Sequence, residues 1–161
     1  MSIPMQPLEA YLILIRHGSA QDTNVNVDRP LTDQGILEIE QVAKKIISEK
    51  IVIDQIYHSG ILRALQTAEI VQKRTNAKSM NPLNQLQKEF SRTQEFWQDF
   101  LDALTETTVL VGHWPSIGQI LMEASLYSNF DFPTGGTICL KKDFNDLSFV
   151  EMWSFSPPKE R

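Results

Sequence analysis

Two histidines and two arginines in this chain have the residue types and the placement needed to handle a phosphoryl group. Arg16 and His17, His113, and Arg63 each follow a short apolar run. Guanidinium groups match the oxygens of a phosphoryl group, and a histidine with one unprotonated ring nitrogen can accept that group covalently. The set indicates phosphoryl transfer in which one histidine attacks phosphorus and the other stabilises the charge that develops.

The same four residues could supply the positive charge that a metal ion often provides in such reactions. The sequence holds no His, Cys, Asp or Glu cluster with metal-ligand spacing, so we expect a reaction without metal or cofactor. Two arginines and one protonated histidine would then neutralise the phosphoryl oxygens. Any one of these residues alone is more often structural or simply solvated. Their joint occurrence at successive strand ends favours a functional site.

Such residues come together only if the apolar runs form neighbouring strands. Short apolar runs predict strands at 11–15, 54–58 and 107–111, and a closing strand pair at 136–141 and 147–155 with a turn at 143–146. Helical spacing of apolar residues predicts helices at 32–49, 61–71, 90–104 and 115–124, with loops at 18–31 and 75–89. Alternating strands and helices predict a three-layer α/β/α sandwich with a mixed, mainly parallel sheet. Ligands bind at the carboxyl ends of the strands in such sheets.

Composition and charge narrow the class of protein. A length of 161 residues fits one domain, 1–161, and the net charge of −5, from 15 basic and 20 acidic side chains, argues against nucleic-acid binding. Residues 1–10 show no secretory signal, and the run 11–15 is too short to span a bilayer. The single Cys139 cannot form an intramolecular disulfide. These features predict a cytoplasmic protein that binds neither nucleic acid nor membrane.

Four segments resemble the histidine phosphatase superfamily, which also contains the cofactor-dependent phosphoglycerate mutases. They occur in the order of that family and read LILIRHGSA at 12–20, RPLTDQG at 29–35, HSGILRALQTAEIV at 58–71 and VLVGHWPSIGQIL at 109–121. Within the superfamily, the chain is most similar to the small SixA-type phosphohistidine phosphatases, because it lacks the long insertions of the mutases and acid phosphatases.

The resemblance implies a role for each matching position. His17 would accept the phosphoryl group, Arg16 and Arg63 would hold its oxygens, and His113 would donate to them in the transition state. Substrate contacts would come from Arg16, Gly18, Ser59, Arg63 and Trp114. Ser59 could equally cap the helix that follows it.

The chain departs from the family at a position that matters for the leaving group. The family often has an acid where this chain has Gln85, and an amide cannot act as a general acid. Glu89 could replace it. Imidazole, with a pKa of about 6.5, leaves more readily than an alkoxide, so the missing acid favours a phosphoramidate such as phosphohistidine. Gly60 stands where proline is common, and His58 and Arg29 are candidates for the rim of the site.

We therefore expect a phosphatase that forms a phosphohistidine intermediate and acts on a phosphorylated histidine-containing phosphotransfer domain of a signalling relay. Two alternatives stay open. The first is a phosphatase for small phosphomonoesters such as a sugar or nucleotide derivative. The second is a module that binds phosphate or phosphohistidine without turning it over.

Overall fold

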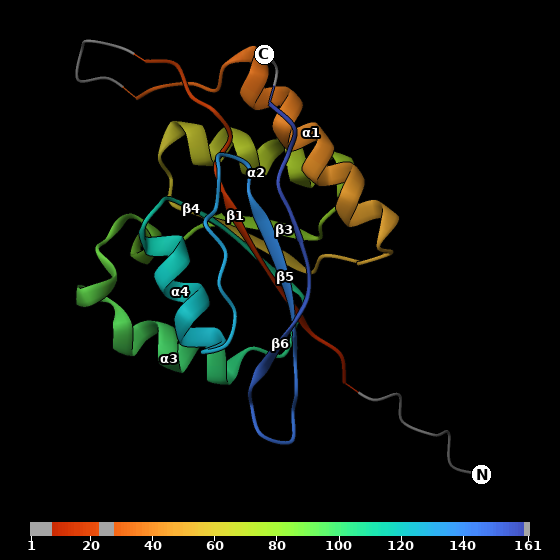
Figure 1. Ribbon diagram of the computed structural model, residues 1–161, viewed down its shortest axis with the longest axis vertical. Helices are drawn as coiled ribbons and strands as arrows, with labels where there is room; N and C mark the ends of the chain where they lie inside the picture. Colours follow the sequence, from red (N-terminus) through yellow and green to blue (C-terminus); the bar gives the residue numbers. More distant parts are fainter. Residues whose placement is uncertain (1–7, 23–27, 160–161) are drawn as a thin grey trace.

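The computed structural model describes residues 8–22 and 28–159, and the strands in these residues form one sheet. The sheet has six strands in the order β3-β2-β4-β1-β5-β6 (Figure 1). They are β1 (Tyr11–Arg16), β2 (Gln55–His58), β3 (Ser79–Pro82), β4 (Thr108–Gly112), β5 (Thr137–Lys142) and β6 (Phe149–Phe155). Parallel pairs join β3 to β2, β2 to β4 and β4 to β1, whereas β5 pairs antiparallel with β1 and β6 with β5. The predicted mixed, mainly parallel sheet is confirmed.

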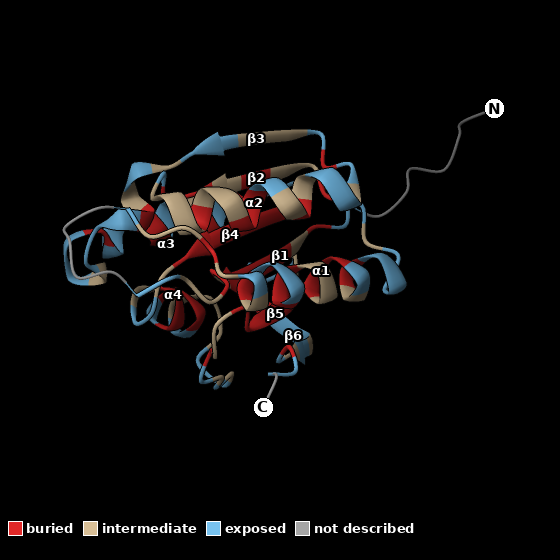
Figure 2. Cartoon of the chain, turned by 90° about the horizontal axis from the view of Figure 1, so that it is seen from above, coloured by how far each residue is buried: buried red, intermediate tan, exposed pale blue. Residues whose placement is uncertain are grey.

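Helices cover both faces of this sheet. They are α1 (Asp33–Ser48), α2 (Leu62–Thr75), α3 (Gln94–Ala103) and α4 (Ser116–Ala124). Alternate residues of β1 enter the two cores: Leu12 and Leu14 pack in the cluster that includes α3 and α4, and Ile13 and Ile15 in the cluster with α1 and α2. This is the predicted three-layer arrangement, with the central strands buried and β3 and β6 at the edges (Figure 2). None of the described helices has the length and apolar character of a membrane span.

The start of α1 follows the sequence prediction. Thr32 caps the helix, because its side-chain oxygen accepts the backbone N–H of Gly35 at 2.9 Å. The segment 18–31 is a loop as far as it is described, with an isolated bridge between Ala20 and Leu31. Part of that predicted loop, residues 23–27, lies outside the described residues. The same holds for residues 1–7 of the segment in which we expect no secretory signal.

The middle of the chain corrects the sequence prediction. Residues 75–89 are not a continuous loop, because they contain β3 and a short 3-10 turn at Asn84–Gln87. The edge strand β3 is polar and partly exposed, so it lacks the apolar alternation by which strands are recognised. The helix predicted at 90–104 begins later, at Gln94, after a second 3-10 turn at Phe90–Arg92.

A buried lysine ties the sheet to the end of α3. Lys142 is 3% exposed. Its Nζ donates to the backbone carbonyls of Leu101, Asp102 and Leu104 at 2.7–2.8 Å. These carbonyls lie at the end of a helix, where the regular helical hydrogen bonds stop and a positive charge is favoured. The Leu101 carbonyl also accepts the backbone N–H of Leu104 at 3.3 Å. Lys142, which lies on β5, therefore provides hydrogen bonds to the carbonyl groups at the end of α3.

The substitution Lys142→Met should destabilise the protein by about 1–3 kcal/mol, because it removes a buried donor that three carbonyls at the end of α3 share. The matched control is Lys141→Met on the neighbouring, partly exposed lysine, whose ion pair with Glu9 spans 3.4 Å. Exposed pairs of this kind contribute at most about 1 kcal/mol. Urea unfolding of both variants is the measurement, and equal losses of stability would contradict the role given to Lys142.

Candidate active site

The ends of three parallel strands bring the candidate residues to one edge of the sheet. Arg16, at the end of β1, lies opposite Gly112 of β4, and the backbone N–H of His17 donates to the Gly112 carbonyl at 3.1 Å. β2, which pairs with the other side of β4, leads into Ser59. The rings of His17 and His113 have centroids 5.0 Å apart. The structure thus places together residues that are about 100 positions apart in the sequence.

Hydrogen bonds identify which nitrogen of His17 is free to attack. Nδ1 lies 2.7 Å from the backbone carbonyl oxygen of Gly18. A carbonyl oxygen can only accept, so Nδ1 carries the proton of the neutral ring and Nε2 carries the lone pair. Arg63 Nε donates toward Nε2 at 3.3 Å. Nε2 is therefore the ring nitrogen with a free lone pair, and it lies next to a guanidinium group.

Both site histidines are held in the neutral form. Burial lowers the pKa of His17 to about 4; the hydrogen bond to Gly18 opposes this shift, and the charges of Arg63 and Arg16 add to it. Burial and the neighbouring His17 ring lower the pKa of His113 to about 3. With this pKa the ring of His113 is neutral at neutral pH, whereas the sequence led us to expect one protonated histidine in the site.

Ser59 orients His113. Its Oγ accepts the backbone N–H of Ile61 at the start of α2 at 3.3 Å and lies 2.7 Å from His113 Nε2. When the Ser59 hydroxyl donates to Nε2, the proton of His113 is on Nδ1. That Nδ1 is buried and has no hydrogen-bond partner in the described part of the chain. Ser59 thus contacts the site and the N-cap residue Ile61, whereas α2 itself has no side-chain cap.

The two arginines approach the histidines from different elements. Arg16 leaves the end of β1, and its Nη1 donates to the Phe132 carbonyl at 2.9 Å. Its Nε is buried without a partner among the residues described. Arg63 lies in the first turn of α2. Burial is the main cause of the lowered pKa of both guanidinium groups, and both remain charged at neutral pH.

Thr67, which was not selected from the sequence, connects Arg63 to Gly18 in the loop that follows His17. Its hydroxyl donates to the Arg63 carbonyl at 2.8 Å and accepts the backbone N–H of Gly18 at 3.1 Å. The sequence did carry a signal for Thr67, because this residue lies one helical turn after Arg63 within the segment HSGILRALQTAEIV at 58–71. Both backbone polar groups of Gly18 thus serve the orientation of His17, and a Cβ at this position would lie 2.8 Å from the Gly35 oxygen.

The remaining candidates lie around this group at different depths. Trp114 is 48% exposed, and its ring packs closely over Gly118 at the start of α4. His58 is buried and accepts the backbone N–H of Gly60, whose φ of +86° suits glycine. Gln85 is half-buried and Glu89 is exposed.

No described contact brings the side chain of Gln85 or Glu89 to the histidines. Gln87 instead reaches the site, because its Nε2 donates to the Ser59 carbonyl at 2.5 Å. The polar composition of this stretch gave no signal that would distinguish Gln87 from its neighbours.

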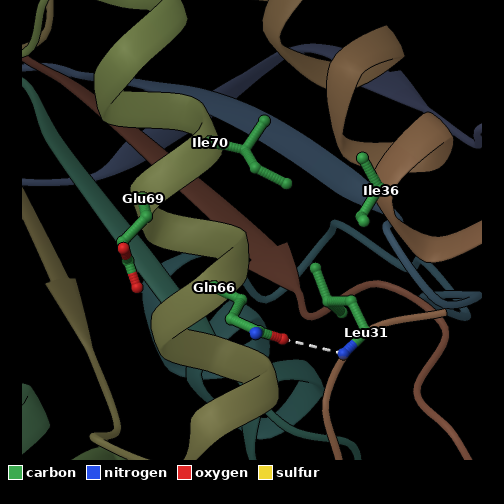
Figure 3. A pocket seen from close by; sticks show the side chains of 5 residues that line it. All are labelled: Leu31, Ile36, Gln66, Glu69 and Ile70. Carbon is green, nitrogen blue, oxygen red and sulfur yellow. Dashed lines mark hydrogen bonds between the residues drawn. The ribbon is translucent and has the colours of Figure 1, made fainter. Parts of the chain in front are cut away.

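Arg29 adds positive charge at the edge of the site. Its charge contributes to the lowered pKa of both His17 and Arg63. The segment that carries it is held by Gln66 of α2, whose side-chain oxygen accepts the Leu31 N–H at 2.8 Å. Figure 3 shows this bond beside a hollow of about 310 Å³ between α1 and α2.

The likeness to solved structures covers most of the chain. The protein histidine phosphatase SixA complexed with tungstate is 24% identical, with a TM-score of 0.78 over 91% of this chain and 97% of that one. The SixA protein from Agrobacterium tumefaciens, described as a putative phosphohistidine phosphatase, is 20% identical with a TM-score of 0.75 over 92% and 99%. A phosphoglycerate mutase from Plasmodium falciparum is 21% identical, with a TM-score of 0.69 over 95% and 97%. At these identities the likeness shows the fold.

The sequence comparison finds a match to one protein family in the first part of the chain. The model of the histidine phosphatase superfamily (branch 1) matches residues 12–90, a segment that includes Arg16, His17 and Arg63. The resemblance recognised from the motifs is thereby confirmed. His113 lies beyond the matched segment and is brought to the same site by β4. No curated protein sequence matches the chain.

The low pKa of His17 predicts how stability depends on pH. The folded ring has a pKa of about 4, whereas unfolding restores the ordinary value of about 6.5. Between these values the unfolded chain binds a proton that the folded chain does not, so acidification favours unfolding. The contribution is fully present above pH 6.5, and about 2 kcal/mol of it should be lost by pH 5.

The measurement is urea unfolding of the wild type and of His17→Gln at pH 7 and pH 5. The wild type should lose more stability than the variant over this interval, since glutamine does not titrate. An equal loss in both proteins would show that His17 has an ordinary pKa.

Proposed function

Because residues 12–90 of this chain belong to the histidine phosphatase superfamily, we propose that the protein is a phosphatase that passes the phosphoryl group through His17. One observation carries this proposal. A neutral histidine with its Nε2 lone pair beside Arg63 lies next to two buried nitrogens, Arg16 Nε and His113 Nδ1, that have no partner in the described residues. A buried polar atom without a partner costs about 1–3 kcal/mol, which phosphoryl oxygens would recover.

In the first step, the Nε2 lone pair of His17 attacks phosphorus in line with the leaving group. The P–N bond to Nε2 forms as the bond to the leaving group breaks, and the leaving group keeps the electron pair. Arg16, Arg63 and the Nδ1–H of His113 stabilise the negative charge on the equatorial oxygens. The positive charge that His17 gains is delocalised over a ring whose Nδ1–H stays bonded to Gly18.

In the second step, water attacks the phosphohistidine. The new O–P bond forms while the P–Nε2 bond breaks, and the electron pair returns to Nε2. Both protons of the attacking water end on the released inorganic phosphate, and the ring of His17 is neutral again. The arginines supply the charge stabilisation in both steps, so the reaction does not require a metal ion.

The substrate we propose is phosphohistidine on a protein, such as a phosphotransfer domain of a signalling relay. A phosphohistidine whose second ring nitrogen is protonated departs as neutral imidazole and needs no proton from the enzyme. This fits a site in which Gln85 stands where an acid is common. The chain between Ser59 and His113 consists of α2, β3, two 3-10 turns, α3 and β4, without an additional capping domain.

The remaining expectations belong to the same proposal. We take residues 1–161 as one histidine phosphatase domain that works in the cytoplasm without a cofactor. The six strands from 11 to 155 share one sheet, which supports a single domain. The free Cys139 is buried, and burial raises the pKa of its thiol to about 12, so it is inert and suits a reducing compartment.

Trapping the intermediate tests the covalent step. After incubation with acetyl phosphate or a phosphorylated phosphotransfer domain, the wild type should carry an acid-labile, base-stable phosphoryl label. His17→Ala should carry no label and show no turnover, while its circular dichroism stays that of the wild type, because His17 follows a strand end. A wild type that binds phosphate but never takes up label would identify a binding module instead.

The role of Arg63 in holding the phosphoryl oxygens can be tested with a matched control on the same helix. Arg63→Ala should lower kcat/KM by about 10²- to 10³-fold, the usual cost of removing one donor that stabilises transition-state charge. Arg74→Ala removes a surface arginine of α2 that pairs with Glu40, and its kinetics should match the wild type. Near-normal kinetics of Arg63→Ala would contradict the clamp.

A comparison of substrates separates the protein substrate from small phosphoesters. The enzyme should turn over a phosphorylated phosphotransfer domain with a higher kcat/KM than sugar phosphates, nucleotides or 3-phosphoglycerate. A preference for the small esters would overturn the phosphohistidine assignment and leave the phosphatase activity in place.

A further inference from the structure

A buried carboxylate lies behind the nucleophile and has no part in the steps above. Glu38 of α1 has a fully buried side chain, with 0% of it exposed. Its Oε1 accepts the backbone N–H of Ser19 at 2.9 Å, and its Oε2 accepts the Ser19 hydroxyl at 2.7 Å, Gln34 Nε2 at 3.1 Å and Lys159 Nζ at 2.7 Å. A buried carboxylate with this many donors is held in one orientation.

The Gly18–Ser19 peptide unit links this carboxylate to the catalytic histidine. The carbonyl that accepts the Nδ1–H of His17 and the N–H that donates to Glu38 belong to that one unit. A peptide unit is planar, so fixing the direction of its N–H also fixes the direction of its carbonyl. Hydrogen bonds in series polarise one another, and a carboxylate at the N–H therefore strengthens the carbonyl as an acceptor.

We propose that Glu38 is a positioning residue for His17, which acts through the Gly18–Ser19 peptide to keep the proton on Nδ1 and the lone pair on Nε2. The series of contacts runs from the carboxylate of Glu38 through one peptide to the imidazole. It does the work that a directly bonded carboxylate does for a histidine in other active sites. The consequence for phosphoryl transfer rests on the proposed function, whereas the effect on the proton position of His17 does not.

Close packing between α1 and the nucleophile loop makes this contact possible. A Cβ on Gly35 would lie 2.1 Å from the Ser19 oxygen, and one on Gly18 would lie 2.8 Å from the Gly35 oxygen. The first turns of α1 thus approach the peptide that holds His17 as closely as backbone atoms allow. Glu38 lies one turn further along the same helix, and its side chain contacts the Gly18–Ser19 peptide.

Lys159 fixes Glu38 from the C-terminal end of the described chain. Its Nζ, besides bonding to Glu38, donates to the carbonyl and hydroxyl oxygens of Thr134 at 2.7 Å. The next residue, Gly135, donates its N–H to the carbonyls of Arg16 and His17, both at 3.0 Å. Lys159 thereby joins the two loops that flank the nucleophile.

Glu38 is also held in its ionised form. Burial by itself raises its pKa, but the hydrogen bonds from Lys159 and Ser19 outweigh that effect, and the net pKa lies below the ordinary value. The peptide of Gly18 and Ser19 therefore faces a full negative charge at neutral pH.

The experiment compares Glu38→Ala, Glu38→Gln and Lys159→Met with the wild type, with Glu40→Gln as the matched control. Glu40 is on the same helix and pairs with the surface residue Arg74. Nitrogen-15 NMR of the histidine rings reports which nitrogen of His17 carries the proton. Steady-state kinetics with p-nitrophenyl phosphate reports kcat and KM separately.

We expect a single Nδ1–H form of His17 in the wild type and in Glu40→Gln. Glu38→Ala should show a mixture of both ring forms and a kcat lowered by about 10- to 100-fold, with KM changed much less, as for other residues that orient a functional histidine. Glu38→Gln keeps an oxygen that can accept the Ser19 N–H, so its kcat and its share of the Nδ1–H form should lie between those of the wild type and of Glu38→Ala. Lys159→Met keeps the Glu38–Ser19 bonds and should show a smaller loss of kcat than Glu38→Ala.

The proposal is overturned if Glu38→Ala and Glu38→Gln keep the wild-type ring form and kcat while only their melting temperatures fall. Should Glu38→Ala fail to fold, Glu38→Gln and Lys159→Met decide by the same two readouts. A wild type without phosphatase turnover would refute the proposed function alone, because the NMR comparison would still test whether Glu38 sets the proton position of His17.

Discussion

One hydrogen bond, from His17 Nδ1 to the Gly18 carbonyl, determines what the site can do. It puts the only proton of the neutral ring on the nitrogen that faces the backbone and leaves Nε2 to face Arg63. Much of the surrounding structure serves this bond. The Thr67 hydroxyl accepts the backbone N–H of Gly18. The Glu38 carboxylate accepts the backbone N–H of Ser19, which belongs to the same peptide unit as the Gly18 carbonyl. The absence of a side chain at Gly18 lets α1 come close enough for that contact.

The electrostatics of the site depend on burial as much as on charge. The chain is acidic overall, with a net charge of −5, yet Arg16, Arg29 and Arg63 all lie close enough to His17 to lower its pKa. Because burial also disfavours the charged imidazole, both site histidines are neutral while the arginines keep their charge. A neutral nucleophile inside a positive site is what attack on a negatively charged phosphoryl group requires, since a protonated imidazole has no lone pair to offer.

The sequence predicted the elements that carry strong patterns. The continuous apolar runs of β1 and β4 are buried on both faces, so their ends, and the residues that follow them, could be located from the sequence alone. The polar edge strand β3 has no such pattern and was missed. The contacts of Phe132 and Gln87 with the site come from a loop and from a short 3-10 turn. The path of both segments depends on tertiary packing, and nothing in their local sequence marks them. Glu38 was missed because a glutamate on an amphipathic helix is usually exposed.

We propose that Arg16, His17, Arg63 and His113 form one oxyanion site with His17 Nε2 as the attacking atom. The most direct test is a crystal structure of the protein with tungstate bound. The anion should lie within hydrogen-bond distance of Arg16 Nε, Arg63 and His113 Nδ1, with His17 Nε2 directed at its central atom. An anion bound away from these four residues, or one that faces Nδ1 of His17, would contradict the account.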